Sequence, residues 1–262
     1  MNYQQLCVGA LEVVSSAAEF IKKEALRFDQ SRIEYKGKNN LVSYVDKGSE
    51  RILVEGLHHI LPGAGFITEE DTPDSEGQYR WIIDPLDGTT NFTHGVPLYC
   101  ISVALMENEK VVIGIVHDIQ SGESFYASKN DGAYLNGKEI RVSQIAQLED
   151  SLIATGFPYY DYSRMKEYMQ VFDFCMNQTH GVRRLGSAAL DLAYVACGRF
   201  EMFYEYGLHA WDVAAGAYIV QIAGGTVTDF KGDNDYIFGG EIVAGNTLIS
   251  APFLEIIKSN FK

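Results

Sequence analysis

Two aspartates close an apolar run in the segment WIIDPLDGTTNF, which spans residues 81–92. Asp84 and Asp87 are separated by a proline and a leucine, and Gly-Thr-Thr-Asn follows directly. One explanation is structural, a strand end followed by a turn and a helix cap. The other is chemical, because carboxylates are metal ligands and a glycine-led turn into a helix can bind phosphate.

Acidic residues end three other apolar segments. Asp46 follows LVSYV, Glu69 and Glu70 follow AGFIT, and Asp212 follows GLHAW and opens a small-residue segment. Taken singly, Asp46 and Asp212 fit helix N-caps, and the acidic run after AGFIT fits a solvated loop. Hard divalent cations such as Mg²⁺, however, need several oxygen ligands, which separate segments can supply together. The candidate ligands are Glu69, Asp84, the backbone oxygen of Leu86, Asp87 and Asp212.

Gly88 and Thr89 follow these ligands within the same short segment. A glycine-led turn into a helix exposes backbone N–H groups to an anion, and Thr89 adds a hydroxyl. Metal ligands beside a phosphate site predict metal-assisted hydrolysis of a phosphate ester. In that chemistry one ion generates a nucleophilic hydroxide and another stabilises the leaving oxygen.

Hydrophobic periodicity predicts the elements that position these residues. Amphipathic helices are expected over about 3–28 and 47–60, with a Gly/Asn-rich connection between them, and AGFIT is expected to be a short strand. Residues 81–142 contain short strands separated by turn signals, which predicts an antiparallel meander. Beyond about residue 148, helices alternate with strands: helices are expected over 161–178, 187–197, 211–223 and 251–260, and strands at SLIATGF, GVRRL, FEMFYEY, GTVTD and EIVAG.

Length and charge exclude several classes of function. The chain has 262 residues, of which 47% are hydrophobic, and a formal net charge of -14. Such a charge disfavours binding to nucleic acid or to anionic membranes. No apolar run is long enough to span a membrane, and the N-terminus has no signal-peptide pattern. The four cysteines are far apart, which predicts free thiols and a cytoplasmic protein.

Four elements in series, NLVSYVD, GFITEED, DPLDGTTNF and WDVAAG, resemble the inositol monophosphatase family of Mg²⁺-dependent, lithium-sensitive phosphatases. The resemblance covers nearly the whole chain, and TGFPYY is more similar to bacterial members than to animal ones. It implies one α+β domain over residues 1–262, a layered αβαβα sandwich of the sugar-phosphatase type. An antiparallel meander sheet is expected in the lobe of about 1–148, and a mixed sheet in the lobe of about 149–262.

The resemblance also implies roles for individual residues. Catalysis would involve Glu69 and Thr89, with Thr89 pairing with Asp46 to orient and activate the attacking water. Glu70 resembles an acid that helps to hold a third, weakly bound Mg²⁺ ion, and Lys36 or Lys38 a lysine near the mouth of the site. The remaining implied roles are metal binding by Glu69, Asp84, Leu86, Asp87 and Asp212, and phosphate binding by Gly88 and Thr89.

The substrate is indicated less directly. Glu205 lies seven residues before Asp212 and resembles a glutamate that contacts sugar hydroxyls. Gly186, Ser187 and Ala188 resemble a segment that touches the inositol ring, and Ser187 also fits a helix N-cap. These residues favour myo-inositol monophosphate, a small phosphorylated polyol. The connection from Glu69 to Asp84 spans only fifteen residues, which leaves lithium sensitivity open.

Several alternatives stay open. Relatives with the same metal core act on fructose 1,6-bisphosphate, 3'-phosphoadenosine 5'-phosphate or histidinol phosphate. Some bacterial relatives bind the transcription machinery as regulators. The basic pair Arg183-Arg184 is the best candidate anchor for such a partner, although a dimer-interface or internal salt-bridge role is the simpler explanation. A homodimer is what the resemblance implies.

Overall fold

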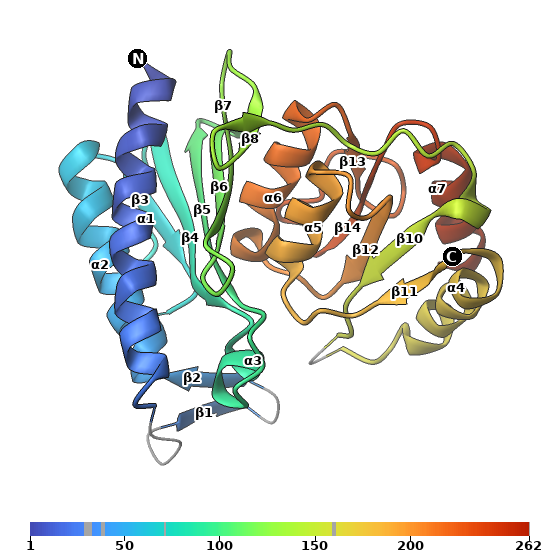
Figure 1. The fold of residues 1–262 in the computed structure, drawn as a ribbon, viewed down its shortest axis with the longest axis horizontal. Coiled ribbons are helices and arrows are strands. Elements are labelled where there is room, and N and C mark those ends of the chain that lie inside the picture. The colour runs from blue at the N-terminus through green and yellow to red at the C-terminus, as the bar shows by residue number, and fades with distance from the viewer. Residues whose placement is uncertain (29–32, 38–39, 71, 159–160, 262) are drawn as a thin grey trace.

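The computed structural model describes residues 1–28, 33–37, 40–70, 72–158 and 161–261. Helices and sheets alternate in five layers across the molecule (Figure 1). A seven-stranded sheet lies between an outer and a middle pair of helices, and a five-stranded sheet lies between the middle pair and a second outer pair. In order, the pairs are α1 (Tyr3–Ala25) with α2 (Tyr44–Ile60), α5 (Ala188–Ala196) with α6 (Ala210–Ile222), and α4 (Met165–Gln178) with α7 (Ser250–Asn260). The predicted αβαβα sandwich is confirmed.

The seven-stranded sheet is the predicted meander with one added strand. It runs in the order β3-β4-β5-β6-β7-β8-β9, and every pair is antiparallel except β3 with β4. Asn108, Asn130 and Asn136 adopt positive φ at predicted turn positions. The strands are β3 (Gly65–Thr68), β4 (Tyr79–Asp87), β5 (Cys100–Glu107), β6 (Lys110–Asp118), β7 (Glu123–Ser128), β8 (Ala133–Leu135) and β9 (Lys138–Glu139).

The five-stranded sheet is mixed, as predicted. Strand β10 pairs in parallel with β11 and β12, whereas β14 pairs antiparallel with β12 and β13. The strands, in the spatial order β11-β10-β12-β14-β13, have the following bounds: β10 (Leu152–Thr155), β11 (Gly181–Arg183), β12 (Met202–Tyr206), β13 (Thr226–Thr228) and β14 (Glu241–Gly245).

Helix α6 lies between the two sheets and is buried on most sides, which explains its run of small residues. A Cβ added at Gly216 would lie 2.5 Å from the Cβ of Leu192 on α5. Likewise, a Cβ at Gly114 of β6 would lie 2.6 Å from the Ala215 carbonyl oxygen of α6. The absence of side chains at these two glycines lets α6 pack closely against α5 and β6 in the middle layer.

Several element boundaries differ from prediction. The segment expected to be a connection forms an antiparallel hairpin of β1 (Ile33–Gly37) and β2 (Asn40–Ser43). Its glycines and asparagines conceal the strand pattern. Helix α2 begins at Tyr44, so Asp46 lies inside its first turn and is not its N-cap. Two short helices, α3 (Thr89–Thr93) and η2 (Leu148–Asp150), complete the chain. No helix in the described ranges is long and apolar enough to cross a membrane.

Candidate active site

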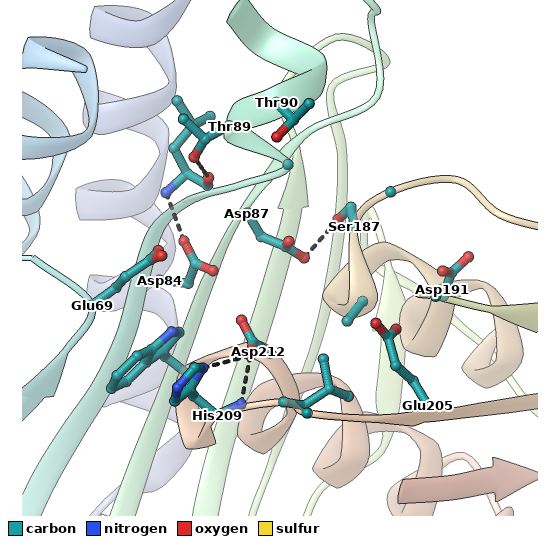
Figure 2. A pocket seen from close by; sticks show the side chains of 18 of the residues that line it. Glu69, Asp84, Asp87, Thr89, Thr90, Ser187, Asp191, Glu205, His209 and Asp212 are labelled. Carbon is teal, nitrogen blue, oxygen red and sulfur yellow. Dashed lines mark hydrogen bonds and ion pairs between the residues drawn. The ribbon is translucent and has the colours of Figure 1, made fainter. Parts of the chain in front are cut away.

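A pocket of about 280 Å³ opens where strand β4 ends (Figure 2). Its wall comes from the ends of β3 and β4, the start of α3, the segment that leads into α5, and the connection from β12 to α6. Most of the predicted site residues line it: Glu69, Asp84, Leu86, Asp87, Gly88, Thr89, Gly186, Ser187, Ala188, Glu205 and Asp212. Segments more than a hundred residues apart in sequence therefore meet in one cavity.

A β-bulge in β4 brings the two aspartates of DPLD to the same side. Asp84 lies opposite Ser102, and Asp87 lies opposite Cys100, so two residues of β4 face one residue of β5. In a regular strand, side chains three positions apart point to opposite faces. The extra residue shifts the alternation by one, and both carboxylates point into the pocket. Pro85 suits this place because it has no N–H to pair with the neighbouring strand.

Hydrogen bonds fix the orientation of both carboxylates. Asp84 Oδ1 accepts a hydrogen bond from the Leu86 N–H at 2.9 Å. Asp87 Oδ2 accepts from Ser187 Oγ at 2.7 Å and from the Ala189 N–H at 2.8 Å. One oxygen of Asp87 is thus held by the start of α5, which ties the end of β4 to the middle layer of helices at the pocket.

Ser187 is the N-cap of α5, as the sequence predicts. Its Oγ accepts from the Leu190 N–H at 3.3 Å and also donates to Asp87. Asn91 links the same two segments, because its Nδ2 donates to the carbonyl oxygens of Leu98 at 2.7 Å and Leu185 at 2.8 Å. The short α3 and the start of α5 are therefore held side by side over the pocket.

Gly88 and Thr89 form the turn from β4 into α3. Gly88 has a φ of 94°, a conformation that favours glycine, and a Cβ there would lie 3.0 Å from the Leu98 carbonyl oxygen. The Thr89 hydroxyl lies 2.8 Å from Asp46 Oδ1 and 2.9 Å from the Leu86 carbonyl oxygen. Asp46 is fully buried and does not line the pocket, so it reaches the site through Thr89.

Glu69 and Glu70 follow β3. Glu69 is half-buried and lines the pocket, so the acidic run is not simply a solvated loop. Glu70 does not line the pocket, and its N–H donates to Glu50 Oε2 at 3.0 Å. Glu50, on α2, is buried and contacts this segment through three hydrogen bonds. The one feature of the sequence that could have indicated this contact is the position of Glu50, one helical turn after Asp46.

Asp212 occupies the third position of α6 and is not the N-cap. The N-cap is His209, whose N–H donates to Asp212 Oδ2 at 2.6 Å. The His209 ring stacks on Trp211 at a centroid distance of 4.7 Å, and both residues line the pocket. The capping contact turns the Asp212 carboxylate towards Asp87 and Asp84 (Figure 2).

The far end of the pocket is formed by Glu205 and Asp191, which were not expected to meet. Both carboxyls are buried, with exposures of 6% and 1%. Gly156 makes room for Glu205, because a Cβ there would lie 2.0 Å from Glu205 Oε2. Arg184 also lines this end, with its guanidinium 5.4 Å from the Phe157 ring centroid.

Proximity and burial shift the ionisation of these acids. Burial, followed by the charges of neighbouring carboxylates, raises the pKa of Glu69 and of Asp84 well above the usual range. The pKa of Asp87 rises to about 7, mainly through burial and then through the charge of Asp212. Burial also raises the pKa of Glu205 and of Asp191. Like charges gathered out of water in this way favour a bound cation.

The donor set fits a hard divalent cation, since it consists of carboxylate oxygens and the backbone oxygen of Leu86. Among the described residues, no three His, Cys, Asp or Glu side chains lie close enough together to enclose one ion. The carboxylates instead line the pocket as an open set. Such a set suits a cation that keeps several of its own water molecules, as Mg²⁺ does.

Of the basic residues that the sequence singles out, Arg183 and Arg184 lie in different environments. Arg184 is half-buried and lines the pocket, whereas Arg183 is exposed. The side chain of Lys36, on β1, lies outside what the structure describes, and so does Lys38. The residues that the sequence analysis did not place in the pocket are Thr90, Gly156, Asp191, Gly207, Leu208, His209 and Trp211.

The layered αβαβα fold and the carboxylate-lined pocket at the end of β4 agree with the class that the sequence resembles, a family of phosphatases. The model of the inositol monophosphatase family matches residues 2–259. The chain belongs to this family and is a phosphatase.

Relatives bear two kinds of name. The chain is 43% identical to "Nus factor SuhB" of Pseudomonas aeruginosa over 91% of this chain and 90% of that protein. It is 37% identical to "Inositol-1-monophosphatase" of Mesorhizobium japonicum over 95% of this chain and 94% of that protein. Among solved structures, the Thermotoga maritima IMPase has a TM-score of 0.87 at 34% identity, covering 95% of both chains.

Proposed function

We propose that the protein is a Mg²⁺-dependent phosphomonoesterase that hydrolyses myo-inositol monophosphate, with two or three ions in each active site. The observation that carries this proposal is one pocket with two different ends. Its acidic end, with Asp84, Asp87 and Asp212, suits cations and the phosphate that they hold. At its far end, Glu205 is an acceptor for the vicinal hydroxyls of a polyol.

The chain's own residues divide the work as follows. Glu69, Asp84, Asp87, Asp212 and the Leu86 oxygen would hold the ions. When bound, Mg²⁺ would supply positive charge that acidifies water and stabilises the leaving oxygen.

Thr89 orients the attacking water. Its hydroxyl donates to Asp46 Oδ1 at 2.8 Å, so its oxygen lone pairs are available to a water in the pocket. As the water loses a proton to Thr89, the Thr89 proton moves towards the buried Asp46. Backbone N–H groups at Gly88 and Thr89 would bind the phosphate, and Ser187 and Ala188 would border the ring; all four residues line the pocket.

Steady-state kinetics with a panel of inositol, fructose, adenosine and histidinol phosphates test the proposal. Activity should be lost in excess chelator, return with Mg²⁺, and give its highest kcat/KM on inositol monophosphate. Full activity in chelator would refute the metal mechanism. A higher kcat/KM on fructose 1,6-bisphosphate or 3'-phosphoadenosine 5'-phosphate would identify that compound as the preferred substrate and would leave the proposed mechanism unchanged.

A second candidate function is regulatory binding to the transcription machinery. The observation that favours it is the 43% identity to a protein named a Nus factor. Such binding need not use the metal site, so the Asp212→Asn variant should still bind purified bacterial RNA polymerase in a pull-down. Absence of binding by the wild-type chain at micromolar concentration would reject this role.

The homodimer implied by the family is part of the proposal. The chain has a mass of 29.2 kDa, so a dimer should give about twice that value in size-exclusion chromatography with light scattering. A mass that stays at the single-chain value at all loading concentrations would reject it.

A further inference from the structure

The first turns of α2 carry three buried polar side chains on one face. Asp46, Ser49 and Glu50 have exposures of 0%, 0% and 3%. They occupy positions i, i+3 and i+4, which lie side by side on a helix. Buried polar groups are costly unless they are hydrogen-bonded, so the partners of these three side chains show what the face does.

Two of these side chains hold the segment that contains the bulge. Asp46 Oδ1 accepts from the Thr89 hydroxyl at 2.8 Å, and Ser49 Oγ donates to the Pro85 carbonyl oxygen at 2.9 Å. The two partner residues, Pro85 and Thr89, belong to the segment that leads from Asp84 to the start of α3. The helix face therefore fixes one half of the acidic end of the pocket.

Glu50 holds the other half. Its Oε2 accepts from the Glu70 N–H at 3.0 Å, and its Oε1 accepts from the Thr72 N–H at 2.9 Å and the Thr72 hydroxyl at 2.7 Å. Strand β3, which leads into this segment, is at the edge of the sheet and pairs only with β4. Beyond Thr68 the sheet gives the chain no partner, and Glu50 supplies the acceptors that a neighbouring strand would supply.

The chemistry of these contacts requires a carboxylate. An ionised glutamate is an acceptor at both oxygens, whereas glutamine presents an NH₂ donor at one end. All three partners of Glu50 are donors, so glutamine would lose at least one bond and place two donors against each other. Within the described residues, no lysine or arginine forms an ion pair with Glu50, so donors alone hold its carboxylate.

We propose that Glu50 is a positioning residue that holds Glu69 and Glu70 in register with Asp84 and Asp87 for cation binding. The inference rests on the proposed function, because it gives Glu50 a role only if the pocket binds Mg²⁺. Glu50 does not line the pocket, and it acts through the backbone after β3.

The test compares Glu50→Gln with Glu55→Gln, an exposed glutamate on the same helix. Isothermal titration with MgCl₂ gives the Kd of the folded protein, and thermal unfolding in chelator gives the stability of the metal-free protein. For Glu50→Gln, the Kd for Mg²⁺ should rise about 10- to 100-fold, the usual range for residues that orient metal ligands. At saturating Mg²⁺, kcat should stay within a few-fold of wild type. Glu55→Gln should match the wild type in both.

Thr72→Val is a second, milder variant that keeps the carboxylate and removes one donor, so it tests the same contact if Glu50→Gln does not fold. It should raise the Kd about fivefold, the effect of one lost hydrogen bond. The inference is overturned if Glu50→Gln or Thr72→Val lowers only the unfolding temperature and binds Mg²⁺ with the wild-type Kd, as a merely structural role would. A wild-type protein that takes up no Mg²⁺ would instead refute the proposed function, and Glu50 would lose its role with it.

Discussion

At the acidic end of the pocket, Asp84, Asp87 and Thr89 are each hydrogen-bonded to a neighbouring part of the protein. At the far end, neither the Glu205 nor the Asp191 carboxylate accepts a hydrogen bond from any described residue. Asp191 Oδ1 is buried and has no partner there. The acidic end is thus organised before a ligand arrives, while the far end leaves its acceptors to be satisfied by the ligand. The two ends should respond differently to substitution.

The largest effect should come from the acidic end. Asp87→Asn or Asp212→Asn removes a charge from the proposed ion site. The kcat should fall by more than about 100-fold on every substrate, because metal ions supply several kcal/mol of transition-state stabilisation. Initial rates at saturating Mg²⁺ measure the loss, and circular dichroism should show an unchanged fold. Asp233→Asn, on an exposed loop, is the control. Near-normal turnover in both variants would show that the acidic end has been misassigned.

A smaller and selective effect is expected at the far end. Gly156→Ala would place a Cβ 2.0 Å from Glu205 Oε2 and displace that carboxylate. KM for inositol monophosphate should rise about tenfold or more, the cost of a lost hydrogen bond to a charged group, while KM for a simple aryl phosphate changes little. Glu205→Gln should show the same selectivity. Gly9→Ala, where the Cβ meets only ordinary contacts, is the control. Equal losses on both substrates would remove the distinction between the two ends.

The smallest effect concerns stability without metal. The pKa of Asp87 is raised to about 7, so the folded protein binds this proton more tightly than the unfolded chain does. Metal-free stability should therefore fall as pH rises from about 4 through 7, and the raised pKa values of Glu69 and Asp84 act in the same direction. Unfolding temperatures in chelator should be a few degrees lower at pH 8 than at pH 5.5, and Mg²⁺ should remove most of the difference. An unfolding temperature that increases from pH 5.5 to pH 8 in chelator would contradict the raised pKa values of these carboxyl groups.

The sequence predicts the acidic end better than the far end, for a physical reason. Asp84, Asp87, Gly88 and Thr89 are adjacent in the chain, so their types and spacing predict a joint role directly. Their shared direction could not be predicted, because it depends on a bulge defined by the pairing of β4 with β5. The role of Glu50 could not be predicted either, because its hydrogen-bond partners lie about twenty residues further along the chain.

The far end is assembled from residues with no local pattern. Gly156 and Asp191 approach Glu205 only when β10 pairs with β12 in the second sheet and α5 packs against that sheet, so nothing near them in the sequence predicts the cavity. The basic pair Arg183-Arg184 suggested a partner anchor, a dimer interface or an internal salt bridge, and only the folded segment before α5 brings Arg184 to the pocket. The fold class was easier to predict from the sequence. The order of helices and strands along the chain indicates a layered structure even when no tertiary contact is known.

Helix α6 also bears on how substrate and phosphate can leave. It carries Asp212 in its first turn and packs against β4, β5 and β6 of one sheet and against β13 and β14 of the other. A hinge motion that separated the two sheets would break the packing of this helix against one of them. It would also expose the small apolar residues of the helix to water, which is unfavourable. Exchange with solvent should therefore occur without separation of the two sheets, and a covalent cross-link between the sheets should leave turnover intact.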